Sequence, residues 1–258
     1  MEYCQVMIDE NVKIVETAGS SPQRFVKVLK SAGIIVIHKC VTIRHALSAE
    51  KYGVDIISLD GFECAGHPGE GDVGNFVLQA RGAQVLTKTP YLCSGGIATG
   101  TQLAASLALG ADGINLGTRL CATKECNWPS NFKNAMLNSN ENDTVLILRK
   151  LQNTSRVYKN DVAIKVAEIE EEKGDEFSIT DVMHLVNGKR GRQAEKNNDS
   201  NDGIWTASQA MGLIHNLPSC KEVIDTMIQE AEECIQNRLN NLLTTNDTTP
   251  TYQRMSRL

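Results

Sequence analysis

Short runs of apolar, mostly β-branched residues alternate with helical segments through the first half of the chain, and this alternation restricts its fold. Near-continuous Val, Ile and Leu in short runs predict strands that are buried on both faces. Such runs occur at Val12–Thr17, Gly33–Ile37, Val54–Leu59, Pro90–Cys93 and Gly113–Leu116. Helices are predicted between them, at Pro22–Ala32, Arg44–Tyr52, Phe76–Ala83 and Thr101–Leu109. Strand and helix in alternation predict βαβ units around a parallel sheet.

The second half of the chain has a different character. Helical periodicity dominates Asn131–Lys173, and the polar, turn-rich stretch Gly188–Asp202 predicts an exposed loop. A last pair of helices is predicted at Ser208–His215 and Cys220–Asn241. We therefore expect a βα region over residues 1–125, a helical region over 126–243 and a disordered tail over 244–258.

Composition excludes several classes of partner. The 258 residues carry a formal net charge of -5, and a mildly acidic chain lacks the clustered Lys and Arg of a nucleic-acid-binding protein. No apolar run approaches the roughly 18 residues of a membrane span, so we expect no membrane partner. The eight cysteines form no Cys-x-x-Cys and no zinc spacing, which favours a reducing compartment and no structural metal.

The last three residues bear on localisation. Ser256-Arg257-Leu258 is similar to the peroxisomal tripeptide Ser-Lys-Leu, with one cation exchanged for another. Coincidence in a frayed tail is the alternative. The sequence is therefore compatible with a cytoplasmic or a peroxisomal location.

Glycine-rich segments follow the last two predicted strands. Ligand sites in parallel α/β folds form beyond the carboxyl ends of the strands. Ser94-Gly95-Gly96 and Gly117-Thr118 lie at two such ends, in consecutive βα units. Glycine lets backbone N–H groups approach an anion closely, as in the phosphate site after strands seven and eight of a (β/α)8 barrel. Either segment alone is explained by a tight turn, whereas the two together predict phosphate binding.

Two further strand ends carry groups suited to chemistry. His67 lies in the glycine-flanked stretch Asp60–Glu70, just past a buried strand, where an imidazole can accept or donate a proton. Glu63 and Glu70 lie in the same stretch and are explained as solvated loop charges. Lys39 lies at the end of another strand, where a cation can sit near a bound phosphate.

These segments resemble the motifs of the nitronate monooxygenase family, formerly called 2-nitropropane dioxygenases. The resemblance covers roughly Glu2 to Leu243, and the segments that carry it are Asp60–Glu70, His38–Ala46, Ser94–Gly96 and Leu116–Arg119. The motif Gly-Phe-Glu-Cys-Ala-Gly-His-Pro-Gly-Glu most resembles a subgroup of the family whose members behave as NADH:quinone reductases. The resemblance implies a (β/α)8 TIM barrel that binds FMN noncovalently, with a helical second domain over its mouth.

The same resemblance assigns roles to individual residues. His67 would be the active-site histidine, and Lys39 and Ala65 would contact the flavin. The FMN phosphate would be held by Ser94, Gly95, Gly96, Gly117 and Thr118. The substrate would be a small molecule, either an alkyl nitronate oxidised with dioxygen or a quinone reduced with NADH as co-substrate.

The chain departs from the family pattern at its beginning. Its first predicted strand, Val12–Thr17, aligns with about the fourth strand of the family, so the first strands are expected to be lacking. Five parallel strands cannot close an eight-stranded barrel, which predicts two open sheet edges, self-association and weaker FMN binding. A truncated gene product, a fragment of a larger protein and a divergent inactive paralogue are the alternatives.

Three classes of function therefore stay open. The first is an FMN oxidoreductase of this family, acting on nitronates or on quinones. The second is a noncatalytic remnant that acts as a binding protein. The third is another phosphate-binding barrel enzyme, such as an isomerase or a synthase, which the segment around His67 disfavours.

Overall fold

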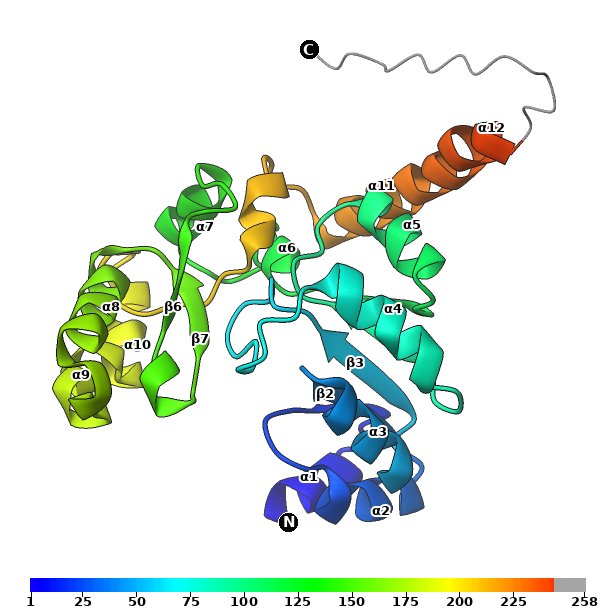
Figure 1. The fold of residues 1–258 in the computed structure, drawn as a ribbon, viewed down its shortest axis with the longest axis horizontal. Coiled ribbons are helices and arrows are strands. Elements are labelled where there is room, and N and C mark those ends of the chain that lie inside the picture. Colours follow the sequence, from blue (N-terminus) through cyan, green and yellow to red (C-terminus); the bar gives the residue numbers. More distant parts are fainter. Residues whose placement is uncertain (244–258) are drawn as a thin grey trace.

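A five-stranded parallel sheet forms the first half of the protein in the computed structural model, which describes residues 1–243 (Figure 1). Its strands are hydrogen-bonded in chain order, and they are β1 (Ile14–Thr17), β2 (Ile35–Cys40), β3 (Ile56–Asp60), β4 (Tyr91–Ser94) and β5 (Gly113–Asn115). Each predicted strand is confirmed with its ends shifted by a few residues. The chain is therefore an α/β protein of the barrel type.

Helices follow the strands as the alternation predicts. They are α2 (Gln23–Ser31), α3 (Ile43–Tyr52), α4 (Asn75–Val85) and α5 (Gly100–Ala108), and the short helix α1 (Glu2–Asp9) precedes the sheet. The boundaries have local causes. The Thr42 side chain accepts from the backbone N–H of His45 at the start of α3, and Gly53 ends that helix with a φ of 82°. Thr99 and Gln102 form a capping box at the start of α5.

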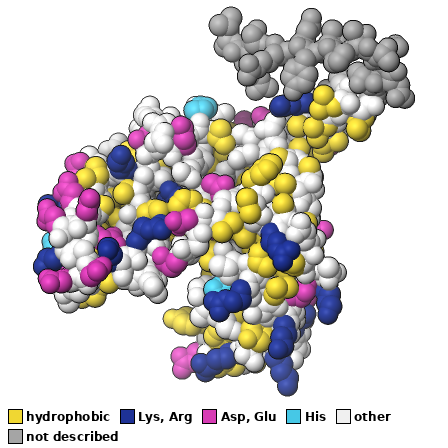
Figure 2. Space-filling view, viewed as in Figure 1, with side chains coloured by type: hydrophobic (Ala, Val, Ile, Leu, Met, Phe, Trp, Pro, Cys, Tyr) yellow, Lys and Arg dark blue, Asp and Glu magenta, His cyan; other side chains and the backbone are white. Residues whose placement is uncertain are grey.

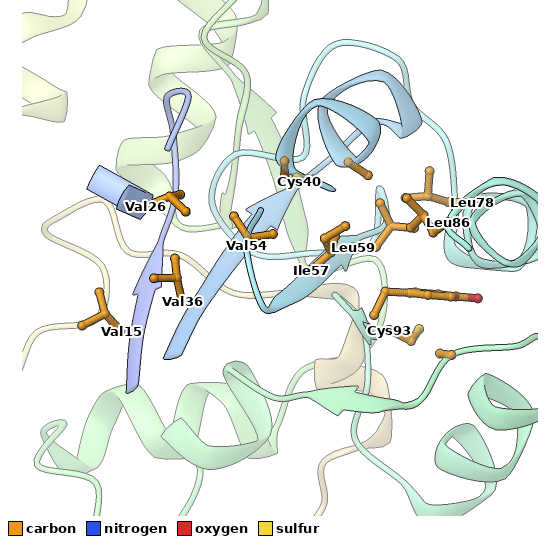
Figure 3. Close-up of a cluster of buried hydrophobic side chains, with 14 of the residues drawn as sticks. Val15, Val26, Val36, Cys40, Val54, Ile57, Leu59, Leu78, Leu86 and Cys93 are labelled. Carbon is orange, nitrogen blue, oxygen red and sulfur yellow. The ribbon is translucent and has the colours of Figure 1, made fainter. Parts of the chain in front are cut away.

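The two faces of the sheet differ because side chains alternate along each strand. Val36, Ile57 and Leu59 are completely buried between the sheet and its helices, where they form the main core (Figure 3). The opposite, concave face carries apolar residues at the amino ends of the strands and polar residues at their carboxyl ends. Ile14 and Ile35 are paired in register on that face and are 55% and 43% exposed.

The sheet has two edges. Within the described residues β1 pairs only with β2, and β5 pairs only with β4. The two edge strands nevertheless come close at their carboxyl ends. The side-chain amide of Asn115 on β5 donates to the Glu16 carboxylate on β1 at 2.9 Å. The sheet is thus curved enough for side chains of its first and last strands to meet.

The second half forms a lobe beside the sheet and then returns to it (Figure 1). Its elements are α6 (Thr118–Cys121), α7 (Ser130–Leu137), β6 (Thr144–Ile147), η1 (Arg149–Leu151), β7 (Ser155–Tyr158), α8 (Asp161–Lys173), η2 (Gly174–Glu176), α9 (Ile179–Val186), α10 (Gly188–Lys196), η3 (Gln209–Leu213), α11 (Cys220–Glu233), η4 (Cys234–Leu239) and α12 (Asn240–Leu243). The helix α11 packs against α5, where Gly100 is required: a Cβ there would lie 2.1 Å from the carbonyl oxygen of Met227.

Three expectations for the second half are wrong. The span Asn131–Lys173 contains the antiparallel hairpin β6–β7 as well as helices. The span Gly188–Asp202 begins with the helix α10, which Asn187 caps through the N–H of Arg190. The span Ser208–His215 forms only the 3-10 turn η3.

Figure 2 shows acidic and basic side chains mixed over the visible face. No helix in residues 1–243 is both long enough and apolar enough to cross a bilayer. The expected tail and the Ser256–Leu258 tripeptide lie outside the described residues, and the division of the chain at residue 125 stays a prediction.

Candidate functional site

A cavity of about 70 Å³ lies at the carboxyl ends of the strands. It is lined by strand ends, by the loops that follow them and by two residues of the second half, namely Lys39, Asp60, Cys64, Ala65, Ser94, Gly95, Gly96, Ile97, Asn115, Gly117, Thr118 and Ser208. This is the position that a parallel α/β fold predicts for its ligand site.

The structure brings together all seven residues predicted to bind a cofactor. They are Lys39, Ala65, Ser94, Gly95, Gly96, Gly117 and Thr118. His67 follows Ala65 by two residues in the same loop, but its side chain is exposed and does not line the cavity. The predicted catalytic histidine therefore lies near the cavity rather than in its wall.

Gly95 and Gly96 can be no other residue. Their φ values are 84° and 74°, in the left-handed region that side chains disfavour. A Cβ on Gly95 would lie 2.7 Å from Cβ of Cys64, and a Cβ on Gly96 would lie 2.7 Å from Cβ of Glu63. The β4 turn is thus pressed against the segment that follows β3. The N–H groups of both glycines donate to no acceptor in the described part of the chain, so they are available to a ligand.

Thr118 closes the cavity from the second half of the chain. Its side chain is 7% exposed, and its hydroxyl oxygen accepts from the backbone N–H of Ser208 at 3.0 Å. The neighbouring Arg119 fixes the same junction, because its guanidinium donates to the carbonyl oxygens of Ala122 and Asn216 at 2.7 and 3.0 Å. Ser208 had no local sequence signal, since it reaches the site from ninety residues further along the chain.

Opposite charges meet at the floor of the cavity. The Lys39 ammonium lies 3.3 Å from the Asp60 carboxylate and 3.7 Å from that of Glu16. Burial acts to lower the pKa of Lys39, but Asp60 and Glu16 outweigh it and the pKa is raised. Burial raises the pKa of Asp60, and Lys39 and two serine hydroxyls offset this effect only in part. The floor of the cavity therefore places a lysine side chain between two carboxyl groups.

Cys64 lines the cavity as a neutral thiol. Burial, reinforced by the charge of Asp60, raises its pKa to about 12. Because the thiolate is the reactive form of cysteine, Cys64 is unsuited to act as a nucleophile at neutral pH. Its contribution to the cavity is shape.

The segment between β3 and α4, which carries His67, is held by the β6–β7 hairpin. Gly66 and Arg156 exchange two backbone hydrogen bonds, at 3.0 and 2.6 Å. The Arg156 guanidinium donates to the Phe62 carbonyl oxygen at 3.0 Å and lies 4.6 Å from the centre of the Phe62 ring. Glu70 accepts from both the backbone and the side chain of Thr154. Glu70 thus joins this segment to the start of β7, whereas the sequence analysis explains it as a solvated loop charge.

The parallel βα sheet and the glycine-lined cavity at its carboxyl edge define an α/β protein of the (β/α)8 barrel class. The family model for nitronate monooxygenase matches residues 2–230, so the chain belongs to that family of oxidoreductases. This confirms the resemblance on which the sequence analysis relied.

Individual relatives agree with this assignment. A probable nitronate monooxygenase from Staphylococcus saprophyticus is 27% identical over 242 residues, covering 90% of this chain and 66% of its own length. FabK from Thermotoga maritima has a TM-score of 0.85 at 28% identity, covering 93% of this chain and 74% of its own. A nitroalkane oxidase from Streptomyces ansochromogenes has a TM-score of 0.72 at 25% identity, covering 90% and 67% of the two chains. This chain spans two thirds to three quarters of these relatives.

Proposed function

We propose that the protein binds FMN at the cavity between Lys39 and Thr118 and acts as an oxidoreductase that oxidises alkyl nitronates with dioxygen. The proposal is carried by the N–H groups of Gly95 and Gly96, which have no acceptor among residues 1–243. They lie at the wall of a cavity that the Lys39 ammonium also lines. Family membership supports a redox reaction on a small molecule.

The residues present fit the phosphate end of FMN. Consecutive N–H groups in left-handed backbone, without an acceptor among residues 1–243, form a concave anion site. Only glycine fits this turn, because added Cβ atoms on Gly95 and Gly96 would clash with Cys64 and Glu63. A volume of about 70 Å³ suits a phosphate group, whereas whole-ligand pockets hold roughly 300–1,000 Å³. The ring system would lie on the side of the cavity that Lys39 and Ala65 line and would extend out of it.

The roles of the chain's own residues follow from charge and position. Bound FMN supplies the redox chemistry, with electrons taken from the substrate and passed to dioxygen. The Lys39 ammonium favours an anionic nitronate and negative charge in its neighbourhood. His67 can accept or donate a proton beside the cavity, in a loop that Arg156 anchors at Gly66.

Two other functions are each supported by a separate observation. The first is the reduction of quinones by NADH on the same flavin. It is supported by the sequence of the Asp60–Glu70 segment, which resembles that of a quinone reductase subgroup. An inactive relative that acts as a binding protein is supported by the two unpaired sheet edges. Each of the three functions gives a different result with purified protein.

The test is an absorption spectrum of the purified chain after incubation with FMN and desalting. We expect flavin bands at less than full occupancy, in line with the weaker binding that the open sheet edges predict. An alkyl nitronate should bleach these bands without oxygen, and they should return when air is admitted. Bleaching by NADH alone, followed by recovery with a quinone, would establish the reductase instead. A colourless protein would reject both and support the binding protein. The variant His67→Gln is expected to retain FMN while the nitronate reacts about 100-fold more slowly.

A further inference from the structure

Asn75, the first residue of α4, contacts the glycine turn after β4. Its side-chain amide donates to the carbonyl oxygen of Ser94 at 2.9 Å and also to that of Gly95. The Ser94 carbonyl oxygen has a second donor, the backbone N–H of Gly61 at 3.0 Å. The Gly95 carbonyl oxygen has Asn75 as its one donor among residues 1–243. The peptide between Gly95 and Gly96 is therefore oriented by Asn75.

The orientation of a carbonyl fixes that of the N–H in the same peptide unit. A trans peptide is planar, and its C=O and N–H point in opposite directions. When Asn75 holds the carbonyl oxygens of Ser94 and Gly95 toward α4, the N–H groups of Gly95 and Gly96 must point the other way. Both of these N–H groups belong to residues that line the cavity, and neither has an acceptor among residues 1–243.

Asn75 is itself held on three sides. It is only 9% exposed, and its side-chain oxygen accepts from Gln79 at 2.7 Å. Gln79 is fully buried and also donates to the Leu59 carbonyl oxygen at 2.8 Å. The backbone N–H of Asn75 donates to both carboxylate oxygens of Glu63 at 3.0 Å. The amide of Asn75 thus has one available orientation, with its NH2 group toward the turn.

We propose that Asn75 is the positioning residue of the anion site and that it sets the preference of this protein for FMN over riboflavin. This inference rests on the proposed function, because it takes the phosphate to lie at Gly95 and Gly96. Riboflavin has the same ring system and lacks the phosphate. Asn75 touches neither the cavity nor the expected position of the ring, so its effect should be confined to the phosphate.

The experiment compares the dissociation constants of FMN and riboflavin for the wild type and Asn75→Ala, measured by quenching of flavin fluorescence. We expect Asn75→Ala to raise the dissociation constant of FMN at least about tenfold, because an N–H group that binds the phosphate loses its fixed direction. The dissociation constant of riboflavin should change less than about threefold. The control is Phe76→Ala, which truncates the adjacent, 79% exposed side chain and should change neither constant. Equal weakening of both flavins, or of neither, would overturn the proposal.

A second pair of variants tests the proposal if Asn75→Ala does not fold. Asn75→Asp has the same shape and loses the donor, and Phe76→Asp places the same charge on the exposed neighbour. A selective loss of FMN affinity in Asn75→Asp alone supports the proposal, and equal losses in both variants reject it.

Amide resonances separate this inference from the proposed function. Inorganic phosphate added to the wild type should shift the Gly95 and Gly96 N–H signals, and Asn75→Ala should abolish the shift at Gly96. If the wild type binds no FMN but shows this pattern, the proposed function fails and the positioning role stands. If phosphate shifts neither signal in the wild type, the positioning role is rejected.

Discussion

At the scale of single residues, the pair Lys39–Asp60 determines how the site responds to pH. Burial holds the pKa of folded Asp60 above its unfolded value of about 3.9, even with Lys39 3.3 Å away. A carboxyl whose folded pKa is raised costs stability as the pH rises past its unfolded pKa, and the cost levels off above the folded pKa. Lys39 has the opposite effect: its pKa is raised, so its stabilisation is complete below about 10.4 and is lost only at higher pH.

The variant Lys39→Met should therefore lose stability in a pH-dependent way. Without the ammonium the pKa of Asp60 rises further, so ionising this carboxyl costs more at pH 7 than at pH 4. We expect a loss of about 1–3 kcal/mol at pH 7 and a clearly smaller loss at pH 4, measured by urea unfolding. Lys165→Met, which breaks an exposed pair with Glu168, is the control and should cost less than about 1 kcal/mol. Equal losses of Lys39→Met at the two pH values would contradict the argument.

Sequence patterns found the residues that belong to strand ends and missed those that reach the site over a distance. Gly95, Gly96 and Thr118 could be predicted because a glycine-rich turn after a buried strand is a local signal. Asn75 and Ser208 could not, because each acts through contacts that exist only after folding. The sequence predicts that this helix begins at Phe76, one residue after its observed start, and no local pattern indicates that the Asn75 amide faces the glycine turn after β4.

At the scale of elements, the β6–β7 hairpin is the clearest failure of sequence reasoning. Its strands have only four residues each, too few for a period of two to stand out beside helical neighbours. The connection contains no glycine turn. Leu148 and Gln152 adopt φ values of 61° and 51°, which non-glycine residues rarely take. The hairpin is fixed instead by distant contacts, among them the Glu170 carboxylate at the N–H of Leu148.

This hairpin should control how firmly the His67 segment is held. Arg156 is 4% exposed and binds the segment through its backbone and its guanidinium. Arg156→Ala should lower the free energy of unfolding by about 1–3 kcal/mol. It should also speed the exchange of the Gly66 amide hydrogen at least about tenfold, measured by hydrogen exchange. Arg149→Ala removes the neighbouring, half-exposed ion pair to Asp72 and should leave Gly66 exchange nearly unchanged. Similar exchange rates in the two variants would show that the side chain of Arg156 does not anchor the segment.

At the scale of the whole molecule, two features predict self-association: the outer edge of β1, which has no partner strand among residues 1–243, and the exposed concave face. An edge strand offers free backbone groups to another chain, and Ile14 and Ile35 add apolar surface beside it. We expect the mass measured by light scattering to rise with protein concentration in the micromolar range. Ile14→Lys should suppress this rise. Ile224→Lys, a matched change at a 53% exposed isoleucine on α11, should not. A monomer at every concentration, or suppression by both variants, would reject β1 as the contact.

The bond between Ser208 and Thr118 also bears on synthesis of the protein. Ribosomes add about 5–20 residues per second, so the ninety residues between these two positions take roughly 5–20 s to make. During that interval the glycine turn and Lys39 have already emerged, while the last residue that lines the cavity has not. A nascent chain therefore presents an unfinished anion site for several seconds, and ligand capture during translation would have to wait for residues beyond Ser208.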